Sequence, residues 1–229
     1  MALSTKIERF GQAESSVLFL KSDTRNKAYA ANVTGQDERG DNAAQDLAGL
    51  RDSPTATYGV KASGNVDLTL GTVNTVGTAK YCLNGLEIST KAGAPPEVTL
   101  SGEQLQDDAT DSSTIPVGAI AVSVRHKAQI LDGAFTLAGD GCKLIECSLS
   151  CKANITRATK DAETLAHDIS GARKLVKATV KQYGATAPTV TPAGGYALLT
   201  PVTDDNPDED HTVHTFELYL DVASVEPAA

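Results

Sequence analysis

The sequence is poor in aromatic residues. Aromatic side chains make up 4% of its 229 residues, and there is no tryptophan. A core made from the remaining Val, Leu, Thr and small residues consists of thin aliphatic layers. A module that binds carbohydrate or a host surface is an alternative, but such modules normally stack sugars on clustered aromatic rings. The chain has few rings for this purpose, namely Tyr58, Tyr81, Tyr183, Tyr196 and a few others.

Long hydrophobic runs are also missing. The run Val17 to Leu20 is too short for the apolar part of a signal peptide, which needs about 7 to 15 residues, and nothing approaches the roughly 20 apolar residues of a membrane helix. We therefore expect synthesis in the cytoplasm, no signal-peptide export and no membrane partner.

Positively charged residues are fewer than negatively charged ones: the chain has 20 Lys and Arg and 29 Asp and Glu, which gives a net charge of −9. Binding to phosphates depends on clustered Lys and Arg, so we expect no specific nucleic-acid binding. The acidic balance suits a channel wall that must not hold DNA, and ordinary solubility explains it equally well.

Motifs for catalysis are absent: the chain has no G-x-S-x-G, G-x-G-x-x-G, P-loop or H-E-x-x-H pattern. His211 and His214 introduce an apparent strand, where residues three apart face opposite sides. His167 and Asp168 are neighbours on a predicted helix and diverge. We predict that the chain is not an enzyme; a hydrolase of unfamiliar type is the alternative.

Cofactor sites are not indicated either. Cys147 and Cys151 would lie on one face of a strand, about 13 Å apart at the usual rise per residue, which is too far for one metal ion. We interpret them, with Cys82 and Cys142, as small hydrophobic residues. The acidic run 204–210 lacks the calcium-loop pattern, so a solvated loop is favoured over a cation site.

Strict alternation of apolar and polar residues is what the chain does have. From Ile145 to Ile155 every second residue is apolar, which predicts a long, half-buried strand. Similar rows give at least seven strand candidates, which include 58–70, 81–88, 97–100, 120–124, 176–180 and 216–222. We predict a single, mainly β domain over 1–229, a β-sandwich or partial barrel.

One short flanking helix is expected at Asp161 to Gly171, where apolar residues recur at helical spacing and Gly171 can end the helix. Asn42 to Leu50 is a weaker helix candidate. Polar segments at 101–114 and 184–211 are predicted to be extended loops, and 1–55 is a possible N-terminal arm.

Two rows of opposite charge are the best candidate contacts. Arg173, Lys177 and Lys181 share the outward face of one strand, and Glu217 and Asp221 share that of another. The rows either pair within one molecule or meet between subunits. The acidic residues of the two predicted loops are added as candidate subunit contacts: Asp107, Asp108, Asp204 and Asp205.

The layout of the C-terminal half, from about Ala119 to Val222, carries a resemblance. A long strand through CKLIECSLSCKANITRA is followed by the helix-like KDAETLAHDIS, the strand RKLVKATVKQYG, a Pro- and Gly-containing arm and the closing strand HTFELYLDV. In this order of elements the chain resembles tailed-bacteriophage virion proteins, in particular the tail-tube (major tail protein) type.

The resemblance implies a sandwich flanked by a helix, with subunits that close into hexameric rings and rings that stack through extended arms into a tube for DNA. The segments 101–114 or 184–211 would then reach a neighbouring subunit, and acidic side chains would line the lumen. Such a protein assembles with itself and other virion proteins in the host cytoplasm. Because the first fifty residues fit this layout less easily, a capsid-decorating or other head protein is an alternative.

Overall fold

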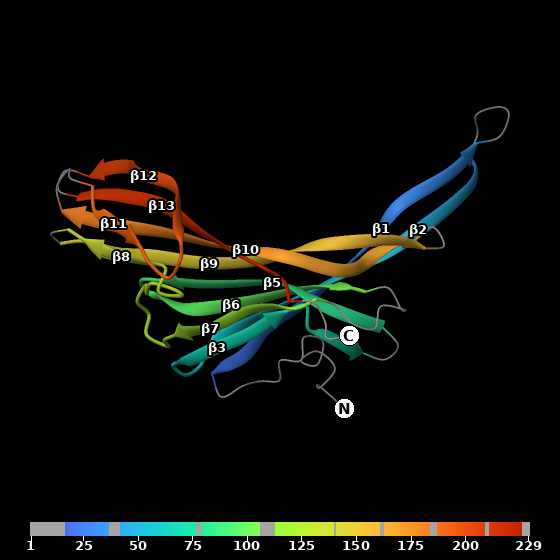
Figure 1. The fold of residues 1–229 in the computed structure, drawn as a ribbon, viewed down its shortest axis with the longest axis horizontal. Helices are drawn as coiled ribbons and strands as arrows, with labels where there is room; N and C mark the ends of the chain where they lie inside the picture. The colour runs from blue at the N-terminus through green and yellow to red at the C-terminus, as the bar shows by residue number, and fades with distance from the viewer. Residues whose placement is uncertain are drawn as a thin grey trace.

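The fold is mainly β and antiparallel (Figure 1). The computed structural model describes residues 17–36, 42–76, 79–105, 113–139, 141–160, 163–183, 187–208 and 211–225. Its strands are β1 Leu18–Gln36, β2 Asn42–Val60, β3 Gly64–Leu70, β4 Val73–Val76, β5 Ala79–Lys91, β6 Ala94–Gln104, β7 Ile115–Val122, β8 Phe135–Ala138, β9 Lys143–Lys160, β10 Glu163–Tyr183, β11 Thr189–Pro192, β12 Ala197–Asp208 and β13 His211–Val222.

One large sheet dominates the molecule. Its strand order is β1-β2-β6-β5-β9-β10-β13-β12, and β4 pairs with β5 beside this path. Two smaller two-stranded sheets, β3–β7 and β8–β11, complete the sandwich-like arrangement. Their apolar residues belong to the same buried cluster as one face of the large sheet, which we call the inner face.

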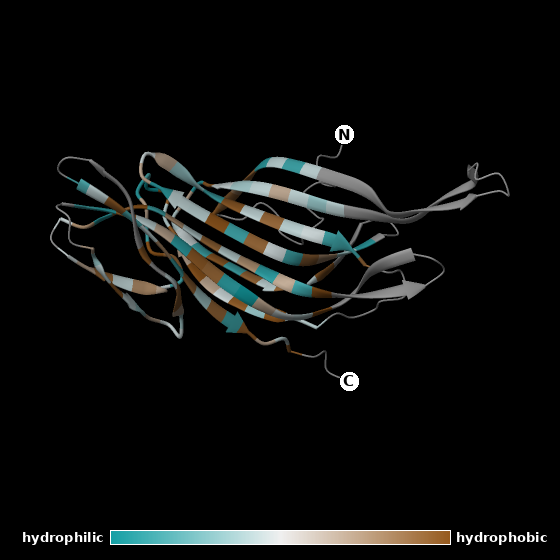
Figure 2. Ribbon diagram, turned by 90° about the horizontal axis from the view of Figure 1, so that it is seen from above, coloured by the Kyte–Doolittle hydropathy of each residue, from teal (hydrophilic) through white to brown (hydrophobic). Residues whose placement is uncertain are grey.

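The alternation in the sequence explains this burial. In β9, Cys147, Leu149 and Cys151 are buried, whereas Ser148 and Ser150 between them remain partly accessible. Figure 2 shows the same alternation as hydrophobic and hydrophilic bands along the strands. Phe135 of β8 meets Phe216 of β13 edge to face, with ring centroids 5.0 Å apart, so the small sheet and the large sheet share one core.

The helix predicted at Asp161 to Gly171 is wrong. The described residues from Glu163 onward belong to β10, which pairs with β9 from Glu163 opposite Lys160 to Lys181 opposite Lys143. β-Bulges between Ala166 and Asp168 and between Ser170 and Ala172 insert extra residues, and each bulge shifts the alternation by one. A strand interrupted in this way places apolar residues at spacings that resemble those of a helix.

The second helix candidate is wrong for a related reason. Asn42 to Leu50 lies in β2 and pairs with β1, for example Leu50 with Tyr29. An isolated helix of this length is marginal in water, and pairing along the whole hairpin satisfies the backbone instead.

The predicted loops also contain strand. β6 runs to Gln104, within the segment 101–114, and β11 and β12 occupy much of 184–211. The candidate arm 1–55 includes β1 and most of β2, whose register runs from Leu18 opposite Val60 to Gln36 opposite Asn42. Polar composition did not prevent pairing, because a neighbouring strand supplies the backbone partners.

Two hairpins extend beyond the body of the large sheet on the same side (Figure 1). β2 pairs with β6 only from Thr55 to Gly59, so the rest of the β1–β2 hairpin continues past that neighbour. β9 pairs with β5 only from Glu146 to Lys152, and the β9–β10 hairpin likewise continues. The end of β12 and the start of β13 lie at the opposite side of the sheet.

Candidate functional site: the outer face of the large sheet

The face of the large sheet opposite to the core, which we call the outer face, is polar. Cross-strand pairing aligns side chains of β2, β6, β5 and β9 in rows, and one row consists of Thr57, Thr99, Glu87 and Ser150. These four residues are half-buried or exposed. A broad sheet with one such face presents hydroxyl and charged groups to whatever contacts it.

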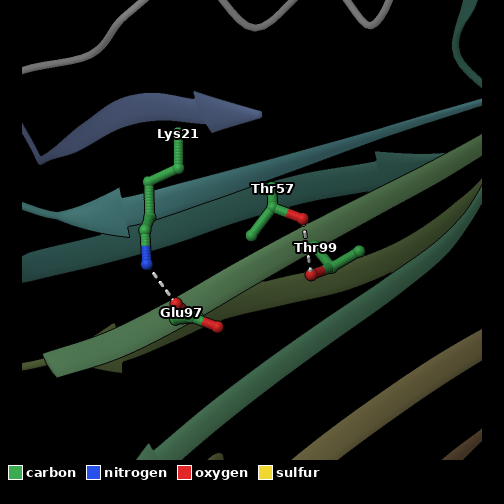
Figure 3. A network of polar contacts seen from close by, with 4 residues as sticks. All are labelled: Lys21, Thr57, Glu97 and Thr99. Atoms are coloured by element: carbon green, nitrogen blue, oxygen red, sulfur yellow. Dashed lines mark hydrogen bonds and ion pairs between the residues drawn. The ribbon is translucent and has the colours of Figure 1, made fainter. Parts of the chain in front are cut away.

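At the β1 edge, polar contacts hold three strands together (Figure 3). Lys21 of β1 makes an ion pair with Glu97 of β6, and the hydroxyls of Thr57 and Thr99 lie 3.4 Å apart. Gly59 lies in β2 between them, and a Cβ atom there would come within 2.4 Å of the Phe19 ring and 3.2 Å of Lys21 Cδ. The glycine therefore lets β1 side chains lie across β2.

The predicted charge rows are on the outer face and meet within the chain. Arg173 Nε donates to Asp221 Oδ1 at 2.7 Å and Arg173 Nη2 donates to Asp221 Oδ2 at 3.1 Å. Lys177 Nζ lies 3.3 Å from Glu217 Oε1. Hydrogen bonding to Arg173 lowers the pKa of Asp221, and the same bond raises the pKa of Arg173.

Both pairs are accessible to solvent. The side chains of Arg173 and Lys177 are each 56% exposed, and the guanidinium carbon of Arg173 lies 4.9 Å from the centroid of the Tyr219 ring. Their intramolecular pairing is the first of the two alternatives drawn from the sequence. A contact with a second subunit would have to form around charges that already have partners.

The remaining candidates are distributed differently. Lys181 pairs with Val213 of β13 and Lys143 of β9. Asp204 and Asp205 belong to β12, opposite His214 and Val213; their side chains fall outside the described part, as do residues Asp107 and Asp108 entirely. The structure thus brings together Arg173 with Asp221 and Lys177 with Glu217.

Histidines and cysteines follow the predicted strand geometry. His214 is buried on the inner side of β13 and His211 is half-buried, three residues away, on the opposite side. Cys147 and Cys151 are both buried in β9, and burial raises the pKa of each thiol to about 11. Within the described ranges no group of three His, Cys, Asp or Glu side chains has the arrangement of a metal site.

A buried charged cluster was not predicted. Lys174 Nζ of β10 donates to Asp132 Oδ2 at 2.7 Å, and Tyr196 Oη donates to the same oxygen at 2.7 Å. The Lys174 and Asp132 side chains are 8% and 19% exposed, and burial together with the bond to Asp132 raises the pKa of Tyr196. The sequence contained one indication of this cluster. Lys174 is a charged residue at a position whose neighbours on the same face, Ala172 and Val176, point inward.

The cluster fixes loops to the sheet. Asp132 lies in the turn before β8 with a φ of 56°, and Tyr196 directly precedes β12. Both residues are joined to β10 through Lys174, so three segments distant in sequence are held at one point. Because Lys174 and Tyr196 are buried and both bind the largely shielded carboxylate of Asp132, we assign the cluster a structural role.

The chain was also compared with known proteins. It matches no protein-family model and no curated protein. In the described part of the molecule, no helix has the length and apolar character needed to cross a membrane.

Proposed function

We propose that the chain is a non-enzymatic structural subunit that assembles with itself, of the phage tail-tube kind, and forms stacked, hexameric rings. The single observation that carries the proposal is the large sheet: a broad, polar outer face, with long hairpins leaving one end. A subunit of this shape offers contacts at its face, its edges and its ends.

The sheet edges support self-association. β1 pairs with β2 and β12 pairs with β13, and within the described residues neither has a second neighbour in the large sheet. An edge strand with unpaired backbone groups can add a strand from another chain. Leu198 and Leu199 of β12 are 42% and 45% exposed, which places apolar contact area beside this edge.

Three of the four tyrosines named as candidates for sugar binding lie in the interior. Tyr58, Tyr81 and Tyr196, which a carbohydrate module would need at its surface, are at most 6% exposed and belong to the interior. Their burial removes them as a stacking platform. A capsid-decorating protein is the second structural candidate, because hairpins that project from one end would also suit attachment to a shell.

Charge reversal of Lys177 and Lys181 tests the proposal. The double variant Lys177→Glu, Lys181→Glu is expected to keep a native circular dichroism spectrum and to lose higher-order assembly in sedimentation velocity. An unfolded variant would instead mean that these charges serve the chain's own sheet. A folded variant that assembles like the wild type would show that this part of the outer face does not take part in the contact between subunits.

A further inference from the structure

The outer face contains a hollow above Gly85, and we call it the Gly85 hollow. It has a volume of 230 Å³ and is lined by residues of β2, β5, β6 and β9, namely Ser53, Thr55, Asn84, Ser101, Gly102, Lys152 and Ala153. Gly85 pairs with Ser101 on one side and Lys152 on the other. A Cβ atom at Gly85 would lie 2.3 Å from Ser101 Oγ, so the glycine lets the Ser101 hydroxyl, which lines the hollow, lie directly against the β5 backbone.

Its lining consists of polar groups that are not engaged elsewhere. Within the described part of the chain, the side chains of Asn84, Ser101 and Lys152 make no hydrogen bond or ion pair. The lining includes one ammonium group, an amide and several hydroxyls, and no carboxylate. Hydroxyl and amide donors beside a cation suit a ligand with negative charge and several acceptor oxygens.

Lys152 contrasts with basic neighbours on the same face. Lys21, Arg173 and Lys177 each have a carboxylate partner in the chain. Lys152 is exposed and pairs in register with Gly85 and Arg173, so no carboxylate stands next to it across the sheet. A carboxylate from another molecule would give Lys152 an ion pair like those that Lys21, Arg173 and Lys177 make within the chain.

The chain carries a dense supply of carboxylates in the acidic segment 204–210, which holds Asp204, Asp205, Asp208, Glu209 and Asp210. Its described part, Asp204 to Asp208, lies far from the hollow of the same chain. Arg173 is opposite Lys152, whereas Tyr183 is opposite His211 at the start of β13. Asp204 pairs with His214, which is opposite Val180 of β10. Seven to ten residues of extended strand, or about 23 to 33 Å, therefore lie between the two rows, and the segment that reaches a hollow must come from another molecule.

We propose that the Gly85 hollow receives the acidic segment 204–210 of a second copy, with Lys152 pairing to a carboxylate and Ser101 and Asn84 donating hydrogen bonds to it. The inference rests on the proposed self-assembly and names a contact that would carry it. It joins the hairpin-bearing side of one subunit to the opposite end of the next, and a contact between two different surfaces can repeat around a ring or along a stack.

Two charge-reversed variants test the contact. Lys152→Glu places a repulsive charge in the hollow, and Asp204→Lys, Asp205→Lys and Asp208→Lys together change the net charge of the segment from −5 to +1. Each variant alone is expected to weaken self-association at least about tenfold in sedimentation velocity at low salt. Lys127→Glu is the matched control, because Lys127 is an exposed lysine in the loop before β8 and the charge change is the same.

Mixing the two variants gives the sharper result. In an alternating assembly every hollow meets a segment of opposite charge, so the mixture is expected to associate while each variant alone does not. Thermal melting followed by circular dichroism checks that each variant is folded. Lys152→Met, which removes the positive charge and keeps a side chain of similar length, is expected to weaken association as well.

The outcomes separate the two proposals. If the wild type assembles and both variants associate as tightly as the wild type, the hollow contact is wrong and the proposed structural function still holds. Weakened variants whose mixture does not recover would overturn the acidic segment as the occupant. A wild type that stays monomeric at every concentration would overturn the proposed function, and the contact with it.

Discussion

At the scale of single residues, the surroundings of two lysines on β10 decide what each contributes. Lys174 and Lys177 are three residues apart, and both pair with a carboxylate. Lys174 is 8% exposed and its partner Asp132 is 19% exposed, whereas Lys177 is 56% exposed. Removal of one member of a buried pair leaves an uncompensated charge in the interior, whereas an exposed pair is screened by water.

We therefore predict that Lys174→Ala lowers the free energy of unfolding by about 3 kcal/mol or more. The matched change Lys177→Ala is expected to cost less than about 1 kcal/mol. Urea denaturation of the two variants measures the difference. Equal destabilisation would mean that the Lys174 cluster is not the buried anchor of its loops.

Buried thiols make the stability of the fold sensitive to alkaline pH. Desolvation raises the pKa of Cys147 and Cys151 to about 11 and that of Tyr58 to about 12. In the unfolded chain these groups lose their protons first, at ordinary values near 8.5 for the thiols. Their stabilising effect is therefore complete below the unfolded-state pKa and is lost as the pH rises through the folded-state pKa.

The free energy of unfolding should fall between pH 9 and 11, with a slope of up to about 1.4 kcal/mol per pH unit for each thiol. Denaturant titrations at several pH values measure this slope. The variant Cys147→Ala, Cys151→Ala is less stable at neutral pH because it leaves cavities, but its alkaline slope should be shallower. An unchanged slope would contradict the assignment to these two thiols.

Inward and outward positions were predictable where alternation is unbroken. The burial of Cys147, Leu149 and Cys151 follows from period two, and so does the shared outer face of Arg173 and Lys177. The partners of a long-range contact do not follow in the same way. Asp132 reaches Lys174 only because the turn before β8 folds back over the inner face, which local sequence does not encode.

At the scale of elements, the strands with unbroken alternation were predictable, whereas their lengths and the strands β1, β11 and β12 were not. β9 and β13 lie where alternation placed them, whereas β10 begins earlier than predicted because two bulges disguise its first part. A bulge changes the phase of the pattern without ending the pairing. Register across the sheet, which creates the Gly85 hollow from β2, β5, β6 and β9, depends on contacts between distant segments and was not accessible from local patterns.

The β1–β2 hairpin should be separable from the fold. β2 pairs with β6 only as far as Thr55, which is opposite Ser101. Beyond this point, in the described register, β1 and β2 pair only with each other. Replacement of residues 28–51 by an Asn-Gly turn, which favours a two-residue hairpin and leaves the register partners Lys27 and Asp52 on either side of the turn, is expected to leave the melting temperature within a few degrees of the wild type. The same variant should fail to form stacked assemblies.

Circular dichroism melting and negative-stain microscopy measure the two effects on one preparation. A control replaces residues 37–41 alone with the same turn, which keeps the paired part of the hairpin. Collapse of the fold in the shortened variant would show that the hairpin belongs to the body of the domain, and undiminished stacking would exclude it from the contacts between rings.

At the scale of the whole molecule, the two ends of the large sheet differ. One end carries the β1–β2 and β9–β10 hairpins, and the other carries Asp204 to Asp208 at the end of β12. Between them lies a polar face whose charges are mostly paired, with Lys152 as an exception. The proposed assembly would use each of these parts.

Negative-stain electron microscopy of the purified full chain over rising protein concentration, with sedimentation velocity on the same samples, tests self-assembly most directly. We predict rings at moderate concentration and stacked rings or tubes at high concentration, with loss of both at high salt because the contacts are charged. Particles of monomer size at every concentration and salt would contradict the proposal.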